Sequence, residues 1–228
     1  MMRHSLAILL AAAALASFTG CGSSSGSHGA GASAASVRLL KGSATVRRGD
    51  RDMPVSAAAP VALLDGDTVE TAAASEAVIT AGKKVQLLAE KTRLRIDSLA
   101  DGTTPATHDR VTLFQGLATF FLPAHQQGYQ FEAMTSTVAA AVKGTIFSLE
   151  TTDAGVRASV IRGEVALLPV DAGGAVGTTP LGSVTADHRV SVAGGAIKDE
   201  PLSAAESATI KEDLILKKEQ LKIDVTTM

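Results

Sequence analysis

The chain has 228 residues, a formal net charge of −2 at pH 7, 46% hydrophobic residues and only 3% aromatic residues. The balanced charge excludes a basic nucleic-acid binder, and the hydrophobic content excludes an acidic disordered chain. The few aromatic residues argue against a site that stacks sugars or single-stranded bases. The length leaves room for one large domain or two small ones.

The amino terminus has the pattern of an export signal. A short basic start, Met1-Met2-Arg3-His4, precedes an apolar run over residues 6–18. As a helix this run is roughly 20 Å long, which is too short for a hydrocarbon core of about 30 Å. We therefore predict a signal peptide over residues 1–20 and not a membrane span.

The signal ends in Phe18-Thr19-Gly20-Cys21, which resembles the lipobox of bacterial lipoproteins, with Phe18 in place of the usual aliphatic residue. Cys21 is the single cysteine of the chain, so it cannot form an intramolecular disulfide. The resemblance implies acylation of Cys21, and Gly22 after it implies the outer membrane. We expect an exported, lipid-anchored protein facing the periplasm of a Gram-negative bacterium; ordinary cleavage that leaves an idle thiol is the alternative.

Residues 22–36 consist almost entirely of Gly, Ser and Ala. This composition behaves as a flexible coil, with an r.m.s. reach of roughly 20 Å for this length. It predicts a tether over residues 21–36, in which His28 is a solvated linker residue.

Short alternating runs begin at Val37. Thr92-Arg93-Leu94-Arg95-Ile96 places Leu and Ile on one face and the arginines on the other, which is the period of a half-buried strand. Turn signals such as Gln115-Gly116 and Arg162-Gly163 recur too closely for crossover helices. The pattern predicts an all-β fold, as a sandwich, barrel or solenoid, and the lack of a strict repeat disfavours a regular propeller or ladder solenoid.

The aromatic residues that follow the signal all lie in one stretch. We expect this stretch to form the thickest part of the core, because large rings supply burial that alanine cannot. A ligand-stacking cluster is the alternative. The residues are Phe114, Phe120, Phe121, Tyr129, Phe131 and Phe147.

The charged tail over residues 196–228 predicts one amphipathic helix. Ser203 and Glu206 have capping-box spacing, and Ile210, Leu214 and Leu221 form a helical stripe that Lys217 interrupts. We predict a helix from about residue 203 to residue 222. It caps an exposed end or edge of the β domain or docks onto a partner.

The run Val142-Lys143-Gly144-Thr145-Ile146-Phe147-Ser148-Leu149-Glu150, followed by Arg162-Gly163-Glu164-Val165, resembles the FecR domain family. Members carry a Val-Arg-Gly-Thr-x-Phe-x-Val signature and a later turn of the form V-x-x-G-x-V. Further segments fit the family pattern, and together they delimit a FecR-like domain over residues 37–195. These segments are residues 37–49, 64–71, 113–121 and 181–192.

The resemblance implies a β-rich, solenoid-like or twisted sandwich domain that senses or binds on the envelope side. We expect its motif residues to be structural: Gly144 permits a strand bend, Thr145 satisfies a backbone group, Phe147 points to the core, and Gly163 forms a turn. Lys143 departs from the family arginine, and lysine lacks the planar fork that binds a carboxylate in a bidentate manner. Familiar members relay an iron-siderophore signal from a transporter to a cytoplasmic sigma factor. We expect no direct sigma-factor contact here, because no cytoplasmic segment precedes the signal.

The chemistry-bearing residues form no recognisable catalytic or metal motif. His28, His108, His125 and His188 are isolated, His108-Asp109 is expected in a solvated loop, and Asp65-Gly66-Asp67 is expected to be a turn. We therefore predict a non-enzymatic protein without metal or cofactor.

Two functions fit this sequence. The first is a lipid-anchored interaction module for a protein, peptide or glycan. The alternative is an envelope-side signalling component that relays a transporter or iron-siderophore signal through a separate membrane partner. The expected partners are the membrane, through the acyl anchor, and another envelope protein, with no nucleic acid; the sequence does not define the oligomeric state.

Overall fold

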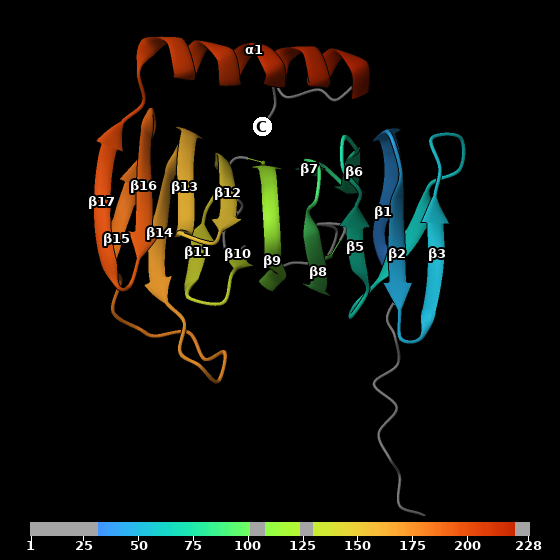
Figure 1. Cartoon of the computed structure of the whole chain (residues 1–228), viewed down its shortest axis with the longest axis horizontal. Helices are drawn as coiled ribbons and strands as arrows, with labels where there is room; N and C mark the ends of the chain where they lie inside the picture. The colour runs from blue at the N-terminus through green and yellow to red at the C-terminus, as the bar shows by residue number, and fades with distance from the viewer. Residues whose placement is uncertain (1–31, 101–107, 124–129, 222–228) are drawn as a thin grey trace, which may run out of the picture.

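The computed structural model describes residues 32–100, 108–123 and 130–221. This part of the chain is mostly β-strand, with one carboxy-terminal helix, α1 (Ala204–Leu221), as Figure 1 shows. The strands form an open, two-layered arrangement rather than a closed barrel, so the predicted all-β class with a terminal helix is confirmed. No helix in the described ranges is long and apolar enough to span a bilayer.

The first layer, called sheet A, lies beneath α1. All pairs of adjacent strands in this sheet are antiparallel. In spatial order it consists of β4 (Val61–Leu64), β1 (Ala32–Lys41), β6 (Glu76–Ala81), β7 (Lys84–Leu88), the second half of β9 (His108–Phe121), β12 (Ile146–Thr152), β13 (Gly155–Arg162), β16 (His188–Ala193) and β17 (Ala196–Pro201).

The second layer, called sheet B, forms the opposite face. Its pairs are antiparallel except for β9 and β10, which are parallel. In spatial order it consists of β3 (Arg51–Val55), β2 (Ala44–Arg48), β5 (Thr68–Thr71), β8 (Arg93–Ser98), the first half of β9, β10 (Gln130–Met134), β11 (Val138–Val142), β14 (Glu164–Pro169) and β15 (Gly182–Thr185).

Strand β9 joins the two layers. Its residues before Gly116 pair with β8 and β10, and those from Gly116 onward pair with β7 and β12. Gly116 has φ +88°, a backbone conformation that favours glycine and lets the strand turn from one sheet to the other. The predicted Gln115-Gly116 turn is therefore a bend within one long strand.

The alternation of each strand sends one set of side chains between the layers. Phe120, Phe131 and Phe147 are fully buried there; the Phe120 ring stacks on Phe147 at 4.8 Å and lies 5.5 Å from Phe131, measured between ring centroids. The predicted aromatic core is thus confirmed for these residues. Phe121 is buried in a second cluster, Phe114 is exposed on the surface, and Tyr129 lies outside the described residues.

Helix α1 begins with the predicted capping box. The Glu206 backbone N–H donates to Ser203 Oγ at 3.2 Å, and the Ser203 N–H donates to Glu206 Oε2 at 3.0 Å. The helix ends at Leu221, one residue before the predicted limit. The side chains of Leu214 and Leu221, which belong to the predicted stripe, are outside the described set.

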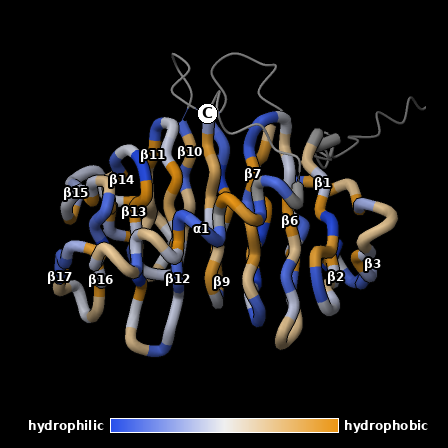
Figure 2. Tube along the Cα trace, turned by 90° about the horizontal axis from the view of Figure 1, so that it is seen from above, coloured by the Kyte–Doolittle hydropathy of each residue, from blue (hydrophilic) through white to orange (hydrophobic). Residues whose placement is uncertain are grey.

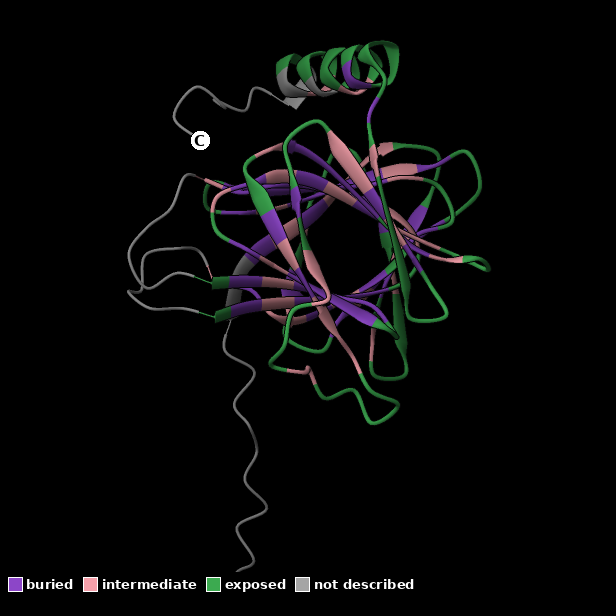
Figure 3. Cartoon of the chain, turned by 90° about the vertical axis from the view of Figure 1, so that its left-hand side faces the viewer, coloured by how far each residue is buried: buried purple, intermediate pink, exposed green. Residues whose placement is uncertain are grey.

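The helix covers a face of the β domain, whereas an end or edge was expected. It crosses the strands of sheet A, as the view down onto α1 in Figure 2 shows. Ile210 packs against an apolar cluster on that face, and the helix also forms ion pairs with the turn before β16 and with β6. Figure 3 shows the helix lying on one layer with most of its own surface exposed. The cluster comprises Val78, Val85, Leu87, Phe121, Ile161 and Leu202, and the ion pairs are Lys211–Asp187 at 2.8 Å and Lys217–Glu76 at 3.4 Å.

The β domain is longer than the predicted range of residues 37–195. Strand β1 begins at Ala32, inside the predicted tether, because its small residues pair with both β4 and β6. At the other end β17 continues to Pro201 by pairing with β16. The predicted signal peptide (residues 1–20), Cys21, His28 and His125 lie outside the described residues.

Candidate interaction surface

The family-motif residues lie where the chain passes between the two sheets. Gly144 has φ +71° in the turn between β11 and β12, and Gly163 has φ +89° between β13 and β14. A Cβ on Gly163 would lie 2.6 Å from Thr145 Cγ2, so this close approach requires glycine. Phe147 is fully buried in the core, as expected. These residues shape the crossover between the sheets.

The expected role of Thr145 is wrong. Its side chain is fully buried, but its hydroxyl oxygen has no hydrogen-bond partner, so it does not satisfy a backbone group. Its backbone carbonyl accepts the Leu122 N–H at 3.0 Å instead. The Thr145 methyl group fills the space over Gly163, which explains why a branched residue of this size fits here.

Lys143 differs from the other motif residues, because it is exposed on the outer face of sheet B. It lines a groove of about 510 Å³ whose floor includes Ala141 and its register partner Ala166. Two small side chains side by side on a sheet face leave a depression between larger neighbours. The lining residues are Gln130, Phe131, Glu132, Ala141, Val142, Lys143, Glu164, Ala166 and Leu168.

The charges around this groove differ in how they are partnered. Glu132 is engaged by Arg110, with Nε at 3.0 Å and Nη2 at 2.8 Å, and by His108 Nε2 at 3.1 Å. Lys143 and Glu164 are exposed and form no ion pair with another side chain of the described ranges. The groove thus presents one cation and one anion on its rim that are free to meet a ligand.

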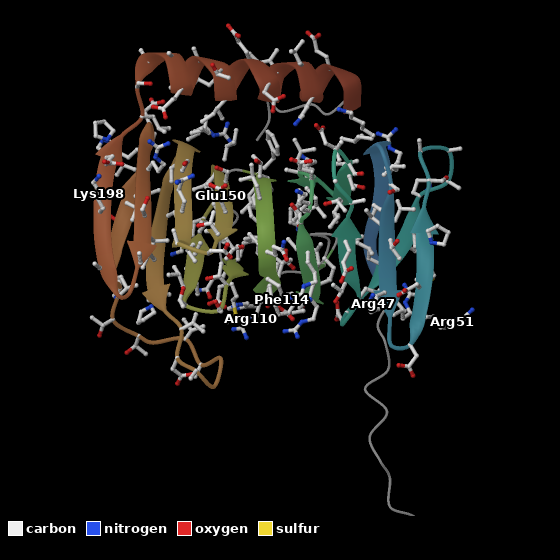
Figure 4. The ribbon with its side chains drawn as sticks, in the orientation of Figure 1. Arg47, Arg51, Arg110, Phe114, Glu150 and Lys198 are labelled. Atoms are coloured by element: carbon white, nitrogen blue, oxygen red, sulfur yellow. The ribbon has the colours of Figure 1, made fainter. Side chains whose placement is uncertain are left out.

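A second feature of the same face is an exposed aromatic ring. Phe114 is 42% exposed, and the guanidinium carbons of Arg93 and Arg95 lie 5.0 Å and 5.3 Å from its ring centroid. Figure 4 shows Phe114 and Arg110 on the side of the molecule away from α1. The sequence predicts Phe114 in the core with the other rings, because large rings supply burial that alanine cannot, so this prediction is wrong for Phe114. Its outward direction follows the alternation of the first half of β9, in which Val111 and Leu113 are fully buried; beyond Gly116 the buried positions shift to Ala118 and Phe120.

Asp109 is buried, and His108 stands at the start of β9, so the expected solvated loop for this pair is wrong. Their side chains lie on opposite faces of the strand. The Asp109 carboxylate forms an ion pair with Lys84 between the sheets and accepts the Ala100 N–H at 2.8 Å. The Lys84 ammonium also donates to the Ala100 carbonyl. This pair is structural, because neither charged group reaches the surface.

The Asp65-Gly66-Asp67 segment forms the expected turn. Asp67 is buried and accepts two hydrogen bonds from Arg48, at 2.8 Å and 2.6 Å, and one from the Leu64 N–H at 2.8 Å. Burial raises the pKa of Asp65, and a backbone hydrogen bond from Leu99 opposes this shift. Over the described ranges, no three His, Cys, Asp or Glu residues gather in a group that could hold a metal ion.

The family model described as FecR protein matches residues 67–166. This segment includes Phe114, the motif residues Lys143 to Gly163 and every groove residue except Leu168. The part of the chain that carries the candidate surface is therefore similar to the FecR family, in agreement with the resemblance seen in the motifs. No curated protein sequence matches the chain.

Two crystal structures of a candidate anti-sigma factor from Parabacteroides distasonis, at 1.65 Å and 2.50 Å resolution, are similar to the chain. Both have 17% sequence identity and a TM-score of 0.49. The alignments cover 63% and 62% of this chain, and 64% and 62% of those chains. The chain thus spans slightly less than two thirds of the length of these proteins.

Proposed function

We propose that this protein is an envelope-side component of FecR-type cell-surface signalling, which relays the state of a transporter through a separate membrane partner. The observation that carries the proposal is the FecR match over residues 67–166, the segment that also contains the exposed groove and Phe114. The proposed role is binding and not catalysis, because both features are suited to contact with a partner.

The arrangement of the two sheets supports a binding role for one face in particular. The apolar cluster on sheet A is covered by α1, whereas sheet B carries the groove and the exposed ring on its outer side. A partner that docks on sheet B would not have to displace the helix. We therefore assign partner contact to sheet B.

We also propose that an acyl anchor on Cys21 holds the domain at the outer membrane. The proposal rests on the lipobox resemblance and on the single cysteine. Two or three acyl chains give stable membrane attachment, whereas one gives marginal binding. The Cys21→Ser variant should leave the membrane fraction; if it stays there, the anchor proposal fails.

The signalling role is tested by crosslinking in intact envelopes followed by mass spectrometry, combined with transcript measurement under iron limitation. We expect one reproducible envelope partner, and we expect loss of the chain to change the transcripts controlled by a partner-linked sigma factor. A reproducible partner without any transcript change would overturn the relay and favour the simpler interaction module. Absence of any partner would overturn both functions.

A further inference from the structure

We infer that Arg93 and Phe114 on the outer face of sheet B form an anchor for an acidic peptide segment of a partner protein, in which an apolar side chain lies beside carboxylates. The inference deepens the proposed function and rests on it only for the partner's location in the envelope. Its chemistry comes from three observations on this face.

The first observation is the direction of Phe114. Phe120, Phe121, Phe131 and Phe147 are at most 6% exposed, whereas Phe114 is 42% exposed. The pairing of β8 with β9 is irregular at this point and skips Phe114. Val111 and Leu113 on the same strand are fully buried, so the regular alternation of β9 points Phe114 outward, and the bulge beside it is a feature common next to functional sites. An exposed ring of this size in an aromatic-poor chain offers an apolar contact to a partner.

The second observation is that the Arg95 guanidinium beside the ring is held in place. Arg95 Nε donates to Asp97 Oδ1 at 2.5 Å, and the other oxygen of Asp97 accepts the Thr112 hydroxyl at 2.5 Å. The Arg95 guanidinium carbon lies 5.3 Å from the Phe114 ring centroid, so the ring packs beside a side chain that is itself held in place. Less conformational freedom is then lost when a ligand binds.

The third observation is that Arg93 has no carboxylate partner among the described side chains. Glu70 is its register neighbour on β5, but the Glu70 carboxylate lies 3.7 Å from Arg47 instead. A guanidinium over an aromatic ring keeps its in-plane N–H donors available, and these match the geometry of a carboxylate. Arg93 therefore offers an unused carboxylate site beside an exposed ring.

These groups favour an acidic peptide over a glycan. Aromatic and arginine side chains are enriched at the energetic centres of protein interfaces. A neutral sugar would have to stack on a ring over which two guanidinium groups already lie. It would also leave the Arg93 charge unmatched, whereas a carboxylate would neutralise it.

The anchor is tested on the full chain with 4-fluorophenylalanine placed at position 114 and observed by fluorine NMR. The probe is the peptide Asp-Glu-Phe-Asp-Glu, and its comparison is Asn-Gln-Phe-Asn-Gln, which keeps the ring and removes the charges. We expect the acidic peptide to shift the signal at about tenfold lower concentration than the amide peptide, because a charge-assisted contact is lost in the latter.

The Arg93→Gln variant should weaken binding of the acidic peptide about tenfold. Arg51→Gln is the matched control, because Arg51 is another exposed arginine and lies on β3, far from Phe114 in Figure 4. It should leave the affinity within about twofold, since surface charges beyond a Debye length of about 10 Å are screened. The inference is overturned if both peptides shift the signal equally or neither shifts it, or if both variants lose affinity equally. It is also overturned if the neutral oligosaccharide cellohexaose, used as the glycan comparison, shifts the signal.

A second experiment separates this inference from the proposed function. A photo-crosslinking phenylalanine analogue is placed at position 114 and, in a separate variant, at Ile197 on β17. An adduct at 114 whose partner peptide carries carboxylates beside an apolar residue supports the anchor. An adduct only at 197, or a partner peptide without carboxylates, overturns the anchor but leaves the signalling role standing. Absence of adducts at both positions overturns the inference, while the transcript measurement decides the signalling role.

Discussion

Replacing Gly163 by alanine tests the structural role of the family motif. Gly163 has φ +89°, and an alanine there would place its Cβ 2.6 Å from Thr145 Cγ2. A non-glycine residue in a positive-φ conformation costs about 1–3 kcal/mol, and overpacking in a dense core costs a further 1–3 kcal/mol or so. We expect G163A to lower the free energy of unfolding by roughly 2–6 kcal/mol, a large share of a typical domain's stability.

Gly174 provides a matched control for the backbone part of this loss. It has φ +83°, and a Cβ at this position would meet nothing within 4 Å, so G174A should cost only the backbone strain. The difference between the two variants measures the contact with Thr145. In a Thr145→Ser background the clashing methyl group is absent, and the extra cost of G163A should largely disappear.

Urea denaturation followed by circular dichroism measures each free energy of unfolding. The reasoning is refuted if G163A is no more destabilising than G174A, or if Thr145→Ser fails to recover the difference. Either result would mean that the close approach at this crossover does not explain why the motif pairs a threonine with a glycine.

Three further predictions concern polar groups of the described structure. Both amide atoms of Gln86 are buried without a partner, so Gln86→Met should raise the free energy of unfolding by about 1–3 kcal/mol in urea titrations; a loss would contradict this. Lys84→Met removes the cation that pairs with the buried Asp109 carboxylate, so it should cost about 3–5 kcal/mol, and a cost below roughly 1 kcal/mol would argue against the buried pair. Hydrogen bonds from Ser203 lower the pKa of Glu206 from 4.5 to about 2, so the cap on α1 is complete above pH 4.5 and is lost as the pH falls toward 2. Amide protection factors in α1, which compare the exchange rate with the intrinsic rate at the same pH, should fall over that range, and Glu206→Gln should remove this pH dependence; a variant that keeps it would refute the assignment.

Local patterns in the sequence were sufficient for the elements whose physics is local. The period-two alternation around Leu94 and Ile96 predicted a strand with one buried face, and β8 shows that pattern. Ser203 and Glu206 predicted the start of α1, because a capping box involves only groups three residues apart. The glycine-bearing motif predicted a strand bend at Gly144 and a turn at Gly163, because positive φ is a property of the single residue; that both lie where the chain passes between the sheets was not predicted.

The candidate surface could not be predicted in the same way. Phe114 shares β9 with the buried Phe120, but the buried positions change from Val111 and Leu113 before Gly116 to Ala118 and Phe120 after it, so one period does not hold along the whole strand. Its guanidinium neighbours come from a different strand, and the groove depends on Ala141 meeting Ala166 across β11 and β14. These contacts join residues distant in the chain, so no local spacing encodes them.

The sequence by itself determined the strand-rich class, the helix start and the residues that carry the FecR resemblance, since each depends on neighbouring residues along the chain. Tertiary structure decided which face α1 covers and which face stays open. The apolar cluster on sheet A contains residues from several strands and from the segment that leads into α1. The helix packs on this cluster because the contact removes apolar surface from water. The outer face of sheet B lies away from α1 and carries the groove, Phe114 and the unmatched Arg93.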